Sequence, residues 1–217
     1  MRGNASILWS SPPQLELVPI PDPEIDIGAL SDGEWNGSLL RVTQFSEVSL
    51  TVVPSSYGHL AAARRGGGHS DPLFLAVTGV TRIGEALVLG KRANDVTDGG
   101  TWEFAPSGGV QRLPIEHQML TEATEELGVS VDSLSIGSPV ALFVDSIAFT
   151  ADLIIPLRVN LSVAQFISTF VPGEYERVEV LHADQVGTFL SHNSADLSAV
   201  TPFIAGLIDE GKLAIFQ

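Results

Sequence analysis

Long β-rich runs alternate irregularly with short helical patterns along this chain, and this order is what most constrains its fold. The β-rich runs include LFLAVTGV, EALVLGKR, TWEFA and AFTADLIIPLRV, and helical patterns are expected over residues 114–127, 163–170, 183–190 and 195–213. A regular alternation of strand and helix would favour an all-parallel, doubly wound sheet. The irregular order instead predicts an α/β (α+β) fold in which a mixed β-sheet is sandwiched between α-helices.

A run of three glycines, Gly66 to Gly68, is the best candidate for a domain boundary. Upstream of it, SLLRV and EVSLTVV predict two strands, and SSYGHLAAARR predicts a short helix. The apolar residues of this segment are too many for a free linker and too few for an independent core. We therefore expect a β-rich N-terminal extension over residues 1–70, packed on a domain over residues 71–217 or on a second copy in a homodimer.

The composition excludes several classes of protein and of site. The chain has 26 acidic and 11 basic residues, a formal net charge of −15 and no cysteine. Such an acidic surface lacks the basic footprint that binding to a nucleic-acid polymer requires. Without thiolates, a metal would be held by oxygen or imidazole ligands, which favours cations such as Mg²⁺. No targeting segment or membrane span of about 18 apolar residues stands out, so we expect a cytoplasmic protein.

The helix expected from Pro114 to Leu127 places three carboxylates, Glu122, Glu125 and Glu126, on one face. Glu122 and Glu126 are a like-charge i,i+4 pair in the C-terminal half, where the helix dipole also disfavours anions. Apart from His117, the helix has no basic residue to compensate them, whereas a divalent cation would. A solvated acidic helix face is the alternative interpretation. The apolar stripe expected to face the sheet consists of Ile115, Met119, Ala123 and Leu127.

The segment GGVQRLPIEHQMLTEATEELGV resembles a degenerate Nudix box, whose usual form is G-x5-E-x7-R-E-U-x-E-E-x-G-U with U aliphatic. Gly108 and Gly109 match its opening, where glycines let the backbone approach a substrate closely. Glu122, Glu125 and Glu126 match the carboxylates that in the family bind Mg²⁺ or Mn²⁺ or position the attacking water. The resemblance implies catalytic and metal-binding roles for these three residues.

The segment also departs from the family pattern at specific positions. The distance from Gly109 to the paired glutamates is two residues shorter than in the box, and Thr121 occupies the arginine position. The first glutamate of the box has no clear counterpart. A catalytically inactive Nudix-fold protein that binds nucleotides or acts as a scaffold is therefore the alternative to an active enzyme.

The resemblance implies a hydrolase that uses Mg²⁺ or Mn²⁺ to cleave the diphosphate linkage of a nucleoside diphosphate derivative. Residues 35–60 are similar to the extension of Nudix proteins that act on UDP-sugars, which makes a nucleotide sugar one candidate substrate. Lys91 and Arg92 end a strand and are expected to contact substrate phosphates, a solvated strand end being the alternative. Glu103 alternates with Trp102 and Phe104 and is interpreted as a surface residue, a position that faces the site being the alternative. Candidates for an additional carboxylate from a later loop are Asp145, Glu174 and Glu176.

Overall fold

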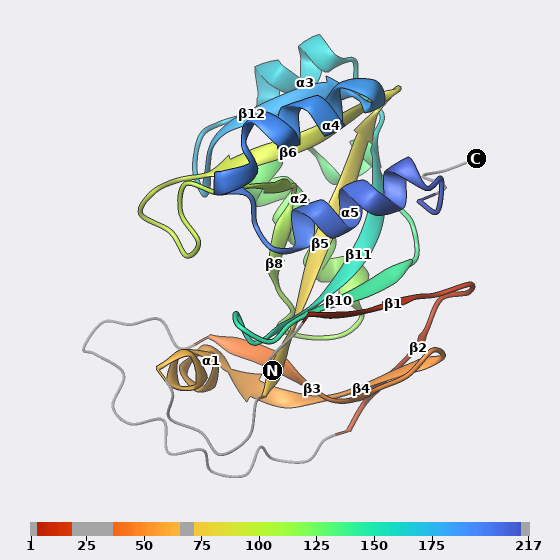
Figure 1. Ribbon diagram of the computed structural model, residues 1–217, viewed down its shortest axis with the longest axis vertical. Helices are drawn as coiled ribbons and strands as arrows, with labels where there is room; N and C mark the ends of the chain where they lie inside the picture. The colour runs from red at the N-terminus through yellow and green to blue at the C-terminus, as the bar shows by residue number, and fades with distance from the viewer. Residues whose placement is uncertain (1–3, 19–36, 66–71, 214–217) are drawn as a thin grey trace. The chain divides into compact units, whose positions relative to one another are not determined.

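The computed structural model describes residues 4–18, 37–65 and 72–213 (Figure 1). The helices among them are α1 (Tyr57–Arg64), α2 (Ile115–Leu127), α3 (Val163–Thr169), α4 (Ala183–His192) and α5 (Val200–Asp209). The first six strands are β1 (Ala5–Leu8), β2 (Gln14–Leu17), β3 (Ser38–Phe45), β4 (Ser49–Ser56), β5 (Leu73–Ile83) and β6 (Ala86–Arg92). The others are β7 (Trp102–Phe104), β8 (Ser107–Gly109), β9 (Leu134–Ile136), β10 (Ala141–Asp145), β11 (Thr150–Val159) and β12 (Tyr175–His182). No helix in these ranges is long and apolar enough to cross a membrane.

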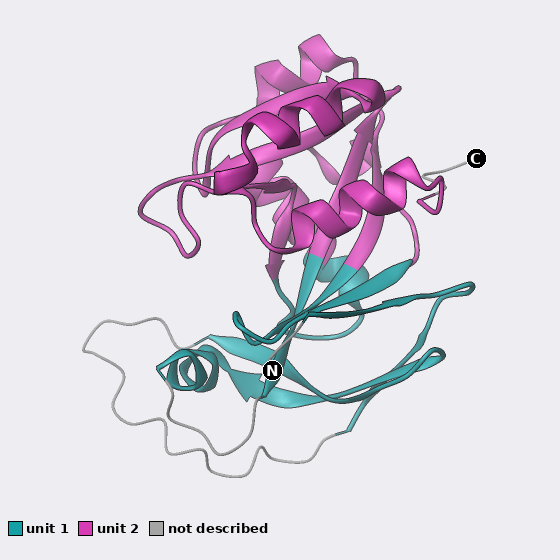
Figure 2. Cartoon of the chain, in the orientation of Figure 1, with its two compact units in different colours: residues 1–77, 109–118, 139–153 teal, residues 78–108, 119–138, 154–217 magenta. Residues whose placement is uncertain are grey.

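The chain forms two compact units, each built from separate stretches of sequence (Figure 2). Unit 1 contains residues 1–77, 109–118 and 139–153, and unit 2 contains residues 78–108, 119–138 and 154–217. The segments β5, α2 and β11 each contribute residues to both units. The predicted boundary between residues 70 and 71 falls outside the described residues, so the division into domains 1–70 and 71–217 stays a prediction.

Unit 1 is a mixed sheet in the strand order β1-β10-β11-β5-β3-β4-β2. β3 runs antiparallel to β4 and to the start of β5, whereas β2 runs parallel to β4. Leu39 and Leu60 of the extension share a buried cluster with Phe74 of β5 and Phe149 of the β10–β11 turn. The two strands and the short helix expected before residue 65 are therefore present, and they bury their apolar side chains against later segments of this unit.

Unit 2 is arranged around β6, which pairs antiparallel with β12 along its length and with β5 and β7 over shorter stretches. On one face, α4 packs against β12 and β6, and α5 packs against β7 (Figure 1). Trp102 of β7 points to this face and meets Phe189 of α4 edge-on, with ring centroids 4.9 Å apart. The core also contains side chains of α2 and α3, so the expected mixed α+β fold with helices on the sheet is observed.

The helix α2 has the apolar face that the sequence predicts. The four residues of its apolar stripe are at most 1% exposed: Ile115, Met119, Ala123 and Leu127. Ala123 and Leu127 belong to a cluster that includes Val88 of β6 and Phe166 of α3. The helix ends before Gly128, whose φ of 67° is a conformation that residues with a Cβ rarely adopt.

The last predicted helix begins later than expected. Instead of a helix from residue 195, a short 3₁₀ turn over Ser194–Asp196 is followed by extended chain, and α5 starts at Val200. The reason is tertiary, because the Ser198 amide donates to the carbonyl oxygen of Trp102 at 3.0 Å. Leu197 also bridges Trp102 in a parallel direction, so this segment follows β7 instead of coiling.

Gly90 of β6 lies against the ring of Tyr175, and this contact gives a test of the packing in unit 2. A Cβ at residue 90 would lie 2.5 Å from Cδ1 of Tyr175. We expect Gly90→Ala to lower the free energy of unfolding by about 1–3 kcal/mol, because the ring and the strand must separate. Denaturant titration measures this loss.

The matched control is Gly187→Ala on α4, where no atom lies within 4 Å of an added Cβ. Alanine is the better helix former, so this variant should gain about 0.5–1 kcal/mol. Equal stability of Gly90→Ala and the parent would contradict the close contact between β6 and Tyr175.

Candidate active site

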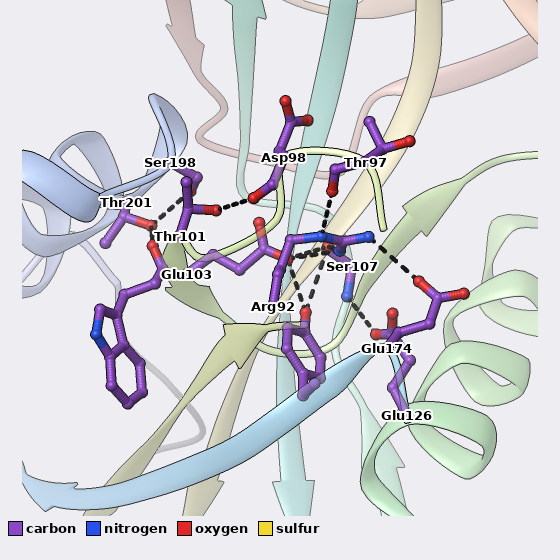
Figure 3. Close-up of polar contacts among 12 residues, drawn as sticks. Arg92, Thr97, Asp98, Thr101, Glu103, Ser107, Glu126, Glu174, Ser198 and Thr201 are labelled. Carbon is purple, nitrogen blue, oxygen red and sulfur yellow. Dashed lines mark hydrogen bonds and ion pairs between the residues drawn. The ribbon is translucent and has the colours of Figure 1, made fainter. Parts of the chain in front are cut away.

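The polar groups of the candidate site come from the end of β6, from β7 and the turn after it, from the start of β12 and from residues 119–127 of α2, all within unit 2 (Figure 3). Glu103 of β7 lies between Trp102 and Phe104 and is only 6% exposed. The interpretation of Glu103 as a surface residue is therefore wrong. The alternation along the strand correctly predicts that Glu103 and Trp102 point to opposite faces. The face that Glu103 occupies is, however, covered by other polar side chains.

One carboxylate oxygen of Glu103, Oε1, accepts three hydrogen bonds. The donors are the Tyr175 hydroxyl at 2.8 Å, Arg92 Nη1 at 2.9 Å and the Ser107 hydroxyl at 2.7 Å. Tyr175 is fully buried, and burial followed by the charge of Glu103 raises the pKa of its phenol well above the ordinary value. The phenol therefore remains a hydrogen-bond donor to Glu103 at neutral pH.

Arg92 is fixed at several points around this carboxylate. Its Nε donates to the Thr97 carbonyl at 2.8 Å, and its Nη2 donates to Glu174 at 3.2 Å. Burial lowers the pKa of Arg92, but the neighbouring Glu103 and Tyr175 outweigh it and raise the pKa overall. The guanidinium therefore stays charged and compensates Glu103 inside the protein.

Lys91, the other basic residue expected to contact phosphate, also faces a glutamate. Its Nζ lies 3.4 Å from Glu176 Oε1, and both side chains are partly exposed. Such an exposed pair contributes little to stability and exchanges readily with other partners. A role of Lys91 and Arg92 in binding substrate stays a prediction.

Glu126 of α2 is a buried carboxylate, 4% exposed. Its Oε2 accepts a hydrogen bond from the Ser107 amide at 2.9 Å, whereas Oε1 is buried and has no hydrogen-bond partner among the described residues. Burial and then the charge of Glu122 raise the pKa of Glu126 well above its ordinary value of 4.5, against the opposing effect of the Ser107 bond. Glu126 lies beside Leu127 and three residues after Ala123, both buried, and this position on α2 explains its burial.

Glu122, one helical turn before Glu126, faces the glycine turn. A Cβ at Gly108 would lie 2.2 Å from Glu122 Oε1, so only glycine lets the carboxylate approach the backbone here. Glu125 is exposed to solvent. Gly109 belongs to unit 1, where an added Cβ would lie 2.6 Å from Leu39. The structure therefore brings Glu122 and Glu126 to the turn and leaves Glu125 at the surface.

The carboxylates around the turn are the candidate ligands of a divalent cation. Within residues 4–18, 37–65 and 72–213, no group of three or more His, Asp or Glu side chains is arranged to hold a metal ion. Glu126 Oε1 is nevertheless a buried carboxyl oxygen without a hydrogen-bond partner in the described structure, close to the charge of Glu122. Two carboxylates beside the partly buried glycine turn suit a hard cation that keeps several of its waters, as Mg²⁺ does. The donor set therefore fits such a cation.

The three candidates for an additional carboxylate lie in different surroundings. Asp145 Oδ1 accepts from the amides of Ile147 and Ala148, so it stabilises the β10–β11 turn in unit 1. Glu176 pairs with Lys91, as described above. Glu174 pairs with Arg92, and its charge contributes to the raised pKa of Glu126. Among these candidates, Glu174 is therefore the one whose charge affects the pKa of Glu126 on α2.

Sequence reasoning missed Ser107 and Tyr175. Ser107 was visible only as part of the turn Pro-Ser-Gly-Gly, and its role depends on partners 4, 19 and 68 residues away along the chain. Tyr175 precedes a short β-rich run, and no local pattern connects it with β7. A tyrosine at the start of a strand rich in charged residues was the signal available.

Comparison with known proteins gives a likeness of fold. No protein-family model matches the chain, and no curated protein matches it. Solved structures similar in fold include DR0079 from Deinococcus radiodurans, at 19% identity and a TM-score of 0.47 over 63% of this chain and 81% of that one. Another is the Nudix hydrolase RenU from M. smegmatis, at 17% identity and a TM-score of 0.46 over 64% and 86% of the two chains.

A third is a bifunctional NMN adenylyltransferase/ADP-ribose pyrophosphatase from Francisella tularensis, solved with AMP and a manganese ion. It has 11% identity and a TM-score of 0.44 over 70% of this chain and 46% of that one. A Nudix hydrolase is thus among the structures to which this chain is similar. At these identities the likeness concerns the fold alone.

The raised pKa of Glu126 predicts how stability depends on pH in metal-free protein. Above its ordinary value of 4.5, Glu126 is ionised in the unfolded chain, while the folded protein still holds the proton. The folded state then binds more protons, so stability falls as pH rises through this interval. Glu126→Gln removes the titration and keeps an acceptor for the Ser107 amide. We therefore expect the stability of the variant relative to the parent to increase as the pH rises above 4.5.

Thermal unfolding of both proteins across this pH range measures the difference. Glu116→Gln serves as the control, because Glu116 is an exposed carboxylate in the first turn of the same helix. A constant difference between Glu126→Gln and the parent at all pH values would show that Glu126 does not hold a proton in the folded protein.

Proposed function

We propose that this chain is a divalent-cation-dependent hydrolase that cleaves the diphosphate linkage of a nucleoside diphosphate derivative. The observation that carries the proposal is the buried Oε1 of Glu126, which has no partner in the described structure and lies near Glu122 at a glycine turn. The resemblance of residues 108–129 to the Nudix box supports the same assignment from the sequence.

The negative charge of the protein explains why binding of a diphosphate would require a cation. A net charge of −15 and two carboxylates at the turn would repel a diphosphate. Mg²⁺ or Mn²⁺, when bound, supplies the positive charge that neutralises diphosphate oxygens and lowers the pKa of bound water. Glu122 and Glu126 would hold the ion. Glu125, exposed on the same helix face, would accept the proton of the attacking water or complete the set of ligands.

The remaining contacts with substrate are assigned to the backbone at Gly108 and Gly109 and to the basic residues at the end of β6. Lys91 would exchange its partly exposed partner Glu176 for a phosphate oxygen. Arg92 is held more firmly, because its side chain is 12% exposed and pairs with two glutamates. Of the two, Lys91 is therefore the better candidate for direct contact with phosphate.

A protein that binds nucleotides without turnover is the second candidate. It is favoured by the exposure of Glu125 and by the lack of a three-residue metal cluster in the described ranges. Formation of a nucleoside monophosphate from nucleotide sugars, dinucleotides and nucleoside triphosphates, each with Mg²⁺ or Mn²⁺, separates the two. Nucleotide sugars come first in this panel. The extension that resembles proteins acting on UDP-sugars contains β3, β4 and α1, while Trp35 lies outside the described residues.

Substitution of the helix carboxylates tests the assignment. We expect Glu122→Gln and Glu126→Gln each to lower kcat by about 100-fold or more, because each removes a charge that holds the cation. Glu125→Gln is expected to lower kcat as well, through loss of a base or ligand. Steady-state kinetics with the best substrate of the panel, together with Mn²⁺ titration, measure these effects.

Glu116→Gln is the matched control, since it removes a negative charge from the same helix at an exposed position of the first turn. It should retain the kcat and the Mn²⁺ affinity of the parent. If Glu122→Gln and Glu126→Gln also bind Mn²⁺ like the parent, the carboxylates form only a solvated acidic face.

A further inference from the structure

We propose that Glu103, Tyr175 and Arg92 are positioning residues that act through Ser107 to orient the carboxylate of Glu126 before any ligand binds. Ser107 connects the two carboxylates. Its hydroxyl donates to Glu103 Oε1 at 2.7 Å, and its amide donates to Glu126 Oε2 at 2.9 Å (Figure 3). The consequence for turnover rests on the proposed function, whereas the orientation of Glu126 does not.

Glu103 can fix Ser107 because Glu103 is itself fixed. Tyr175 from β12 and Arg92 from β6 donate to the same oxygen that Ser107 contacts. Arg92 is anchored in turn to the carbonyl of Thr97 and to Glu174. The position of Ser107 is therefore determined by two strands and by the loop between β6 and β7.

Glu126 depends on this arrangement because the Ser107 amide donates to its Oε2 at 2.9 Å. With Oε2 held by that amide, Oε1 remains without a hydrogen-bond partner. The bond from Ser107 thus decides which oxygen of Glu126 is left for a ligand.

Stability alone does not account for this network. A buried ion pair such as Arg92–Glu103 is often no more stabilising than apolar side chains of similar volume, because both charges lose their hydration. Fixed geometry at a neighbouring site is what such a network supplies and an apolar core does not. The network also ends at the backbone turn that precedes Gly108, next to Glu122.

The test measures the Ser107–Glu126 bond directly, by hydrogen exchange of the residue-107 amide in the metal-free, full-length protein. Tyr175→Phe removes the phenol hydroxyl that donates to Glu103. Ser107→Ala removes the serine hydroxyl that donates to Glu103 and keeps the backbone amide that donates to Glu126. In both variants we expect this amide to exchange about tenfold faster relative to the amides of the β6–β12 ladder. Ser107→Thr keeps a hydroxyl and should restore the protection.

The controls are Tyr57→Phe, which alters the other tyrosine of the chain, and Ser133→Ala, which alters a partly exposed serine outside the network. Both should leave the residue-107 amide as protected as in the parent. Unchanged protection in both Tyr175→Phe and Ser107→Ala, after normalisation to the ladder, would overturn the inference, because the network would then be structural only.

Mn²⁺ titration and kinetics on the same variants extend the test to function. If the parent binds Mn²⁺, Tyr175→Phe should weaken binding by about tenfold, and in an active enzyme it should lower kcat more than it raises KM. A parent that neither binds Mn²⁺ nor turns over any substrate overturns the proposed function. The exchange result still decides the positioning role in that case.

Discussion

The pairing of Arg92 with Glu103 inside unit 2 is the interaction on which the candidate site depends. Without the guanidinium, Glu103 would be a buried anion beside other carboxylates, at a cost of several kcal/mol. With it, Glu103 becomes a fixed acceptor to which Tyr175 and Ser107 both donate. The turn after β7 is therefore fixed by hydrogen bonds and an ion pair, while α2, which faces the turn, is fixed by the burial of its apolar stripe.

Two glycines show how closely backbone and side chains approach around this pairing. Gly90 lets the Tyr175 ring lie directly on β6, which brings the phenol to Glu103, and Gly108 makes room for the Glu122 carboxylate. Neither glycine has an unusual φ, so their role is space rather than backbone conformation. The site is therefore sensitive to the volume of residues that carry no chemistry themselves.

The elements that the sequence predicts well are those with a local cause. The period of Ile115, Met119, Ala123 and Leu127 is sufficient to predict which face of α2 is buried, and Gly128 marks its end. The environment of Glu103 was not predictable, because alternation defines two faces of a strand without showing what covers them. The late start of α5 has the same origin, since a hydrogen bond between residues 96 positions apart outweighs local helix propensity.

The interleaving of the two units has a consequence for how the chain must fold as it is synthesised. Unit 1 lacks its last stretch until residue 153 has left the ribosome, and by then unit 2 has already begun with residues 78–108 and 119–138. Until residues 139–153 have been synthesised, the N-terminal extension therefore lacks part of its unit and has unpaired strand edges exposed. Long-range pairing of this kind slows folding and favours aggregation of incomplete chains. Vectorial synthesis thus places the greatest hazard at the first third of the chain rather than at the candidate site.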